Sequence, residues 1–151
     1  MRVDQDRSQP IMRLPVDRVP ARVTLEDGRQ LESWLFVPVG DDVAEMFGKP
    51  EAFLPVDTGT GILIVARAVI AAVLVRRARL ETSDDLPVDR QPARVHLRGG
   101  QVVEGELRWT AAPGYRRTVD LMNDPSRHVV VHAREGVTYV AKAQIAWIEE
   151  A

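Results

Sequence analysis

Leu14-Pro15-Val16-Asp17-Arg18 returns later in the chain as Leu86-Pro87-Val88-Asp89-Arg90, and Pro20-Ala21-Arg22-Val23 returns as Pro92-Ala93-Arg94-Val95. The separation is 72 residues throughout, and 13 of the 22 positions from Leu14 to Leu35 are identical to their counterparts. Identity at this level indicates a tandem duplication, so the fold is to be derived for one repeat and applied to both.

The duplication divides the chain of 151 residues into two small domains. We expect a flexible N-terminal segment at residues 1–13, a first repeat at 14–80, a linker at 81–85 and a second repeat at 86–151. A single repeat of about 65 residues has a marginal hydrophobic core. The two repeats are therefore expected to pack together or to find partners through oligomerisation.

The composition is that of a globular protein, with 45% hydrophobic and 28% charged residues. Cysteine is absent, which excludes disulfides and thiolate metal sites and fits a reducing compartment. The first repeat carries 8 Lys/Arg against 9 Asp/Glu and the second 9 against 8, so neither has the basic excess of a domain that follows a phosphate backbone. No apolar leader opens the sequence, and Arg67 interrupts its longest apolar stretch, Gly61–Val75. We expect a cytoplasmic protein with no membrane partner.

The start of each repeat predicts a β-hairpin. Ala21–Leu25 alternates small or apolar residues with polar ones, Glu26-Asp27-Gly28-Arg29 supplies a turn, and Gln30–Val37 follows as a second strand. The second repeat copies this plan with Ala93–Leu97, the turn Arg98-Gly99-Gly100 and the strand Gln101–Thr110.

The later part of each repeat predicts two further strands. After a longer middle segment in the second repeat the offset becomes 75, and Ile64–Val73 then matches Tyr139–Ile148. Each block reads as a strand, a tight turn at a basic residue (Arg67 or Lys142) and a strand. Helix formers favour a helix over Val65–Leu80, but the β-branched and aromatic residues of the matching block favour strands in both copies. Between hairpin and block, Asp42–Phe47 predicts a single helical turn capped by Asp.

These elements predict an all-β fold of two tandem five-stranded small barrels, with short helical turns in loops. Within the second repeat, Ala93–Leu107 resembles the first motif of the Sm-like family, which includes the Sm, LSm and Hfq proteins. It has an apolar strand, a glycine turn and a second strand with a glycine, Gly105, at its bend. Asp120-Leu121-Met122-Asn123 resembles the loop that ends this motif, and Tyr139–Ile148 is similar to the second motif.

The resemblance departs from the family pattern at several positions. Ala143 stands where the family prefers Gly, and the first repeat has Ser33 and Ala68 at the two glycine positions. Small barrels of the SH3-like kind share much of the hydrophobic pattern. The resemblance implies Sm-like or SH3-like barrels that join edge to edge into rings. It also implies RNA contacts by the loop Asn and the basic turn residue.

Five residues of the second repeat form the candidate ligand site: Arg116, Arg117, Asp120, Asn123 and Lys142. Asp120 and Asn123 either form a ligand loop or, as we favour, make an Asx turn or helix cap. The two arginines either clamp a phosphate or form a solvated basic loop. Lys142, like its counterpart Arg67, is either a pore cation or an exposed polar residue of a tight turn.

Histidine and tryptophan supply no strong candidate. His128 and His132 are four residues apart, which on a strand separates them by roughly 13 Å, too far to share one metal ion. We therefore expect no metal site. Trp147 lies in an alternating strand and is expected in the core, whereas Trp34 and Trp109 are not at matched positions, so one of them is expected on an exposed face or at a contact between repeats.

The sequence favours an interaction module over an enzyme. It contains no nucleophile elbow, P-loop or dinucleotide-binding glycine motif, so we expect no catalysis and no cofactor. The exposed barrel edges and the long loop Ala111–Arg127 are expected to bind a protein partner or further copies of the chain, closing a ring. The alternative is RNA or nucleotide binding through the loops of the second repeat.

Overall fold

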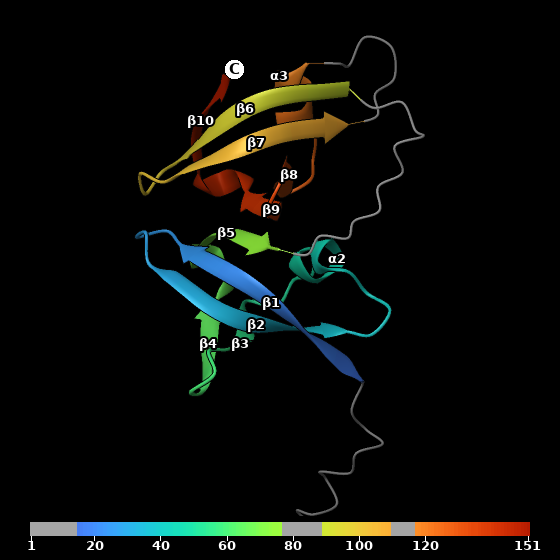
Figure 1. Cartoon of the computed structure of the whole chain (residues 1–151), viewed down its shortest axis with the longest axis vertical. Coiled ribbons are helices and arrows are strands. Elements are labelled where there is room, and N and C mark those ends of the chain that lie inside the picture. Colours follow the sequence, from blue (N-terminus) through green and yellow to red (C-terminus); the bar gives the residue numbers. More distant parts are fainter. Residues whose placement is uncertain (1–14, 77–88, 110–116) are drawn as a thin grey trace, which may run out of the picture.

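The fold is described here from a computed structural model, for residues 15–76, 89–109 and 117–151. It is all-β: ten antiparallel strands form one open sheet in the order β10-β6-β7-β8-β9-β5-β1-β2-β3-β4. The strands of the N-terminal half fill one end of this order and those of the C-terminal half the other, and the halves are stacked in Figure 1. Within these ranges, none of the helices has the length and apolar character needed to cross a bilayer.

Both halves run through the same series of elements: two strands, a short helix, two strands separated by a turn, a 3-10 turn and a last strand. In the first half these are β1 (Val16–Leu25), β2 (Gln30–Pro38), α2 (Val43–Phe47), β3 (Phe53–Asp57), β4 (Ile62–Ala66), η2 (Arg67–Val69) and β5 (Ile70–Val75). In the second half they are β6 (Asp89–Leu97), β7 (Val102–Trp109), α3 (Thr118–Met122), β8 (His128–Ala133), β9 (Gly136–Ala141), η3 (Lys142–Gln144) and β10 (Ile145–Glu150).

Local sequence explains the hairpins and the first short helix. Gly28 and Gly100 take φ values of 95° and 99° in the two hairpin turns, a region that residues with a Cβ avoid. Asp42 caps α2 by accepting the backbone N–H of Glu45 at 2.8 Å, and the Glu45 carboxylate accepts the backbone N–H of Asp42 in return. Both predicted hairpins, the capped helical turn and both strand–turn–strand blocks are confirmed.

Gly105 allows two strands of the second half to approach closely. A Cβ at this position would lie 2.5 Å from the backbone oxygen of His132 on β8. β7 pairs with β8 at a single position, Glu106 opposite His132, immediately after this glycine. The first half has Ser33 here, and its hydroxyl donates to the backbone oxygen of Ala21 at 3.3 Å.

The sheet encloses two hydrophobic cores. The first is built from buried side chains of β1 to β5 and α2, among them Val23, Leu35 and Val56, which are fully buried. The second is built around Val95, Leu107 and Val140 of the second half. Each core contains four Val or Leu side chains that are fully buried.

The halves are joined by strand pairing between β5 and β9. Ala72 lies opposite Val140, Val73 opposite Tyr139, and the ladder continues to Val75 opposite Val137. At its end Gly136 lies against the first half so closely that a Cβ would be 2.2 Å from the backbone oxygen of Val75. The close backbone approach therefore requires glycine at 136.

Residues near the junction cross into the core of the other half. Ala71 and Ala72 of β5 belong to the second core, and Tyr139 of β9 packs against the first. The Gln144 side-chain amide donates to Glu26 at 3.2 Å and to the backbone oxygen of Ala68 at 3.4 Å, both in the first half. The two halves thus share a continuous interface rather than a linker alone.

Two expectations need qualification. The ten strands form one sheet with open edges at β4 and β10. The strand pairing therefore does not show the two separately closed barrels that the sequence predicted. The predicted burial of Trp147 is wrong: this side chain is 58% exposed, on the strand β10 that ends the sheet of the described residues. The N-terminal segment 1–13 and the linker 81–85 lie outside the described residues.

Candidate functional site

Arg117 and Asp120 form a local pair at the start of α3. The Arg117 guanidinium donates to both carboxylate oxygens of Asp120 at 3.2 Å, and its backbone N–H donates to the same carboxylate at 3.4 Å. These hydrogen bonds hold the pKa of Asp120 below its ordinary value, because they stabilise the ionised form. Asp120 therefore acts as a helix cap, the interpretation favoured from the sequence. Arg116 lies outside the described residues.

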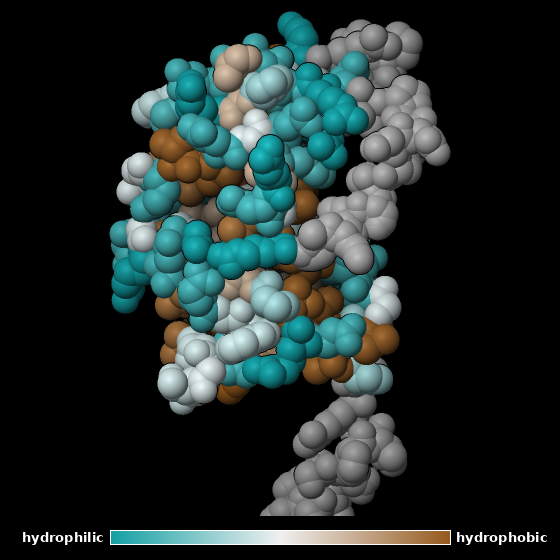
Figure 2. Space-filling view, viewed as in Figure 1, coloured by the Kyte–Doolittle hydropathy of each residue, from teal (hydrophilic) through white to brown (hydrophobic). Residues whose placement is uncertain are grey.

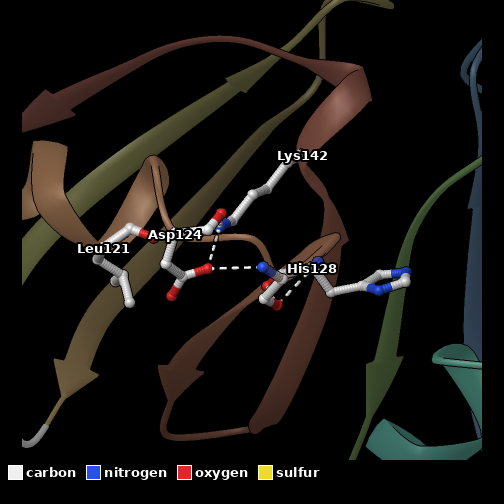
Figure 3. A network of polar contacts seen from close by, with 5 residues as sticks. Leu121, Asp124, His128 and Lys142 are labelled. Carbon is white, nitrogen blue, oxygen red and sulfur yellow. Dashed lines mark hydrogen bonds and ion pairs between the residues drawn. The ribbon is translucent and has the colours of Figure 1, made fainter.

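Lys142 is engaged within its own half. Its Nζ donates to the backbone oxygens of Leu121 at 3.1 Å and Asp124 at 3.3 Å, and to the Asp124 carboxylate at 2.8 Å (Figure 3). The side chain is only 14% exposed. The Asp124 carboxylate, whose pKa is lowered chiefly by its hydrogen bond from Lys142, completes this cluster.

Arg67, the counterpart of Lys142, has the same structural role in the first half. Its guanidinium donates to the backbone oxygens of Glu51 and, at 3.3 Å, of Met46 at the end of α2. Each basic turn residue therefore donates to backbone carbonyl groups at or just after the C-terminal end of the short helix in its half. A cation is favoured there because the last carbonyl groups of a helix carry partial negative charge. The sequence showed the matched cations but not their acceptors, and Asp124 was not among the predicted site residues.

Asn123 ends α3 and is exposed. Its backbone N–H donates to the Val119 carbonyl at 3.0 Å, which closes the helix. The structure thus brings Arg117 to Asp120 and Lys142 to Asp124, while Asn123 remains at the surface beside them. Both described cations of the predicted site neutralise carboxylates of their own half.

Four of the nine large hydrophobic side chains that are exposed among the described residues lie at the open edge of the first half. On β4, Ile62, Leu63 and Ile64 are 52%, 42% and 65% exposed. Phe53 on the neighbouring strand β3 is exposed as well. The face in Figure 2 shows brown, hydrophobic surface between teal, hydrophilic residues over the lower, first-half end of the molecule. An apolar strand without a neighbour is a template for pairing with another chain.

The opposite edge, β10, also carries apolar surface. Trp147 stacks on His96 with ring centroids 4.4 Å apart and leaves its outer side in solvent. Beside it, an apolar groove of about 510 Å³ runs between β10 and α3, lined chiefly by Val119, Met122, Ile145 and Ile148. The sequence signal for these edges was the run Ile62-Leu63-Ile64, which predicted a strand but not that the strand would be at an edge.

The histidines and the other tryptophans have ordinary structural surroundings. His128 and His132 are half-buried on β8, and burial is the main cause that lowers the pKa of each. No three side chains of the described ranges are arranged to hold a metal ion. Trp34 lies under the Arg18 guanidinium at 4.8 Å from its ring centre, and Trp109 packs against the second core.

Comparisons with known proteins do not assign the chain to a family: it matches no protein-family model, no curated protein and no solved structure. The two open edges and the junction of the halves are the features of the described residues that bear on function.

Proposed function

We propose that the protein is a non-enzymatic assembly module that binds further copies of itself, with the β4 edge of one copy pairing with the β10 edge of the next. We further propose that each half is a small barrel of the Sm-like or SH3-like kind. Two observations support this finer description: each half surrounds a core of its own, and each repeats the same order of strand pairing.

The junction inside the chain supports the proposed contact between chains. There, β5 of the first half pairs with β9 of the second. By the repeat, β10 is the counterpart of β5 and β4 is the counterpart of β9. The two free edges are therefore the same pair of edges that already join the halves, and a second copy offers each of them the missing neighbour.

The exposure of matched residues carries the proposal. Ala72 is 4% exposed because it enters the core of the second half, whereas its counterpart Trp147 is 58% exposed. Tyr139 packs against the core of the first half, whereas its counterpart Ile64 is 65% exposed. Side chains that cross into a neighbouring core at the internal junction thus have apolar counterparts at the free edges.

The internal register predicts the register between copies. Applying the offset of 75 to the β5–β9 ladder places Trp147 of one copy opposite Val65 of the next. Ile148 then lies opposite Ile64, and Glu149 opposite Leu63. Covering one large aliphatic side chain fully is worth about 1.5–3 kcal/mol, so the three exposed residues of β4 supply a substantial part of the contact.

The contact is head to tail, because β4 and β10 are different surfaces. Such contacts generate a closed ring when the rotation between copies closes, and an open filament when it does not. We propose a closed ring, which then contains an even number of halves. A ring leaves no apolar edge strand open, which is the physical reason for favouring it.

Light scattering coupled to size-exclusion chromatography tests this function. The unmodified chain is expected to elute as a discrete oligomer over a wide range of protein concentration. The double variant Ile62→Lys with Ile64→Lys is expected to elute as a folded monomer, because charges on an edge strand oppose pairing. The matched control is Val39→Lys, at a residue that is 57% exposed but lies outside both edges.

A wild-type chain that stays monomeric at high concentration would contradict the proposed function. So would an oligomer that persists in the double variant. Growth in mass without limit as concentration rises would replace the ring with a filament.

A further inference from the structure

A cavity of about 530 Å³ lies between the two halves, where residues of both line its wall. Phe47, Pro50 and Ala52 line it beside α2, and Ala68 and Ile70 follow from the η2–β5 segment. The second half contributes Arg127 and His128 before β8 and at its start, and Ala141–Gln144 around η3. The cavity exists only because β5 pairs with β9, so it belongs to the joined halves.

The wall of this cavity, which we call the junction cavity, is mainly apolar. Small or hydrophobic side chains form most of it, and the ring of Phe47 packs against that of His128 with centroids 5.4 Å apart. Three cations, Arg67, Arg127 and Lys142, face one carboxylate, Glu51. The Glu51 side chain is 61% exposed, so solvent weakens its hold on the cations.

The cations of the junction cavity have different roles. Arg67 and Lys142 are fixed by carbonyl and carboxylate groups of their own halves, and both are largely buried. Arg127 is exposed, and no carboxylate of the described residues forms an ion pair with it. Its guanidinium is therefore available to an incoming anion, with the two fixed cations adding to the positive potential.

His128 gives the cavity a neutral polar group. Figure 3 shows its imidazole ring pointing away from the Lys142 cluster, toward the strand and helix of the first half. Burial and the neighbouring Arg67, Arg127 and Lys142 lower its pKa, which keeps the ring uncharged near neutral pH. The ring makes no hydrogen bond to any group in the described part of the chain.

We propose that the junction cavity binds a small organic monoanion with an apolar body, such as a medium-chain or aromatic carboxylate. The apolar body fills the space against Phe47, Ile70 and the alanines, and the carboxylate reaches the rim at Arg127. An apolar cavity with a few convergent polar groups is the common form of a small-molecule site. Because both halves supply the wall, the ligand stabilises their junction.

The carboxylate is favoured over other ligands by the charges and the shape together. A cationic ligand would meet three positive side chains and one exposed carboxylate. An uncharged ligand would gain nothing from the positive charge at Arg127, and a bare phosphate would leave the apolar wall in contact with water. Only an amphipathic anion satisfies both parts of the cavity.

Isothermal titration of the whole chain with sodium octanoate tests this inference, with 1-octanol, octylamine and sodium phosphate as comparison ligands. Octanoate is expected to bind, and each comparison ligand at least about tenfold more weakly. Arg127→Gln is expected to weaken octanoate binding about three- to fivefold, the range of a solvent-exposed ion pair. The matched control Arg134→Gln, at an exposed arginine of the β8–β9 turn, is expected to leave binding unchanged.

Filling the cavity supplies the second arm of the test. Ala143→Trp and, from the other half, Ala68→Trp are expected to abolish octanoate binding while the circular dichroism spectrum stays that of the wild type. The inference is overturned if octanoate does not bind at millimolar concentration, if 1-octanol or phosphate binds as well as octanoate, or if the folded tryptophan variants still bind it. If both variants unfold, the comparison of ligands on the wild type decides alone.

Discussion

Replacing Lys142 by Met tests whether this residue is a structural cation. Methionine retains the apolar length of the side chain but removes the Nζ group, which donates to the Leu121 and Asp124 carbonyls and to the Asp124 carboxylate. Hydrogen bonds from a charged donor contribute about 1.5–3 kcal/mol each, and exposed ion pairs about 0–1 kcal/mol. Water can reach part of this cluster, because the Asp124 side chain is 42% exposed.

The expected loss is about 2 kcal/mol of unfolding free energy, below the about 3 kcal/mol that two carbonyl bonds would contribute at the low end of that range, because water reaches part of the cluster. For a chain of this size, that loss corresponds to a decrease in Tm of about 4–8 °C. Urea unfolding followed by circular dichroism measures the free energy, and a thermal scan measures Tm. Arg29→Met is the matched control, since the Arg29 side chain is 75% exposed and pairs with Asp27 at the surface; its expected cost is below about 0.5 kcal/mol.

A Lys142→Met variant as stable as the Arg29→Met control would refute this reasoning. The cation would then be free for another role. Binding of a fluorescent oligonucleotide that depends on Lys142, without a change in stability, would return the RNA-binding alternative to the second half.

Three further predictions concern the junction and the titrating groups. Gly136→Ala should destabilise the folded chain by about 2–3 kcal/mol in urea unfolding, because the new Cβ meets the Val75 backbone; unchanged stability would show that the backbones can separate without cost. The folded pKa of His128 lies below its ordinary value of 6.5, so its contribution to the unfolding free energy is present above pH 6.5 and lost as the pH falls through the folded pKa. The variant His128→Gln should therefore show a flatter dependence of the unfolding free energy on pH in this range. If the unfolding free energy of that variant depends on pH as steeply as that of the wild type, His128 is not the group responsible. The Arg117–Asp120 pair should lose its contribution only as the pH falls below 3.8, and an NMR titration that finds the Asp120 pKa at or above 3.8 would disprove the pairing.

Much of the local structure could be predicted because it depends on neighbours in the sequence. The turns at Gly28 and Gly100 need positive φ values, which glycine alone adopts readily. The helical turn after Asp42 follows from a capping box that is complete within four residues. Helix formers favoured a helix over Val65–Leu80, and only the β-branched and aromatic residues of the matching block in the second repeat decided for strands.

The errors and omissions depend on contacts between distant residues. Trp147 has the alternation of a half-buried strand, but whether such a strand has a neighbour is decided by the whole sheet. Asp124 could not be recognised as the partner of Lys142, because the two are 18 residues apart. The pairing of β5 with β9, which joins the halves and exposes the edges, left no signal beyond the apolar character of both strands.

The most direct test of the proposed assembly uses the absence of cysteine from the chain. A variant with Ile64→Cys and Ile148→Cys places two thiols opposite each other between copies, at the about 4.5–5.5 Å Cα separation of directly opposed antiparallel residues, which suits a disulfide. Mild oxidation is expected to give a ladder of covalent multimers under denaturing electrophoresis, whereas either single variant gives dimers at most. Quantitative recovery of the oxidised double variant as monomer, at concentrations where the wild type is oligomeric, would contradict the head-to-tail pairing of β4 with β10.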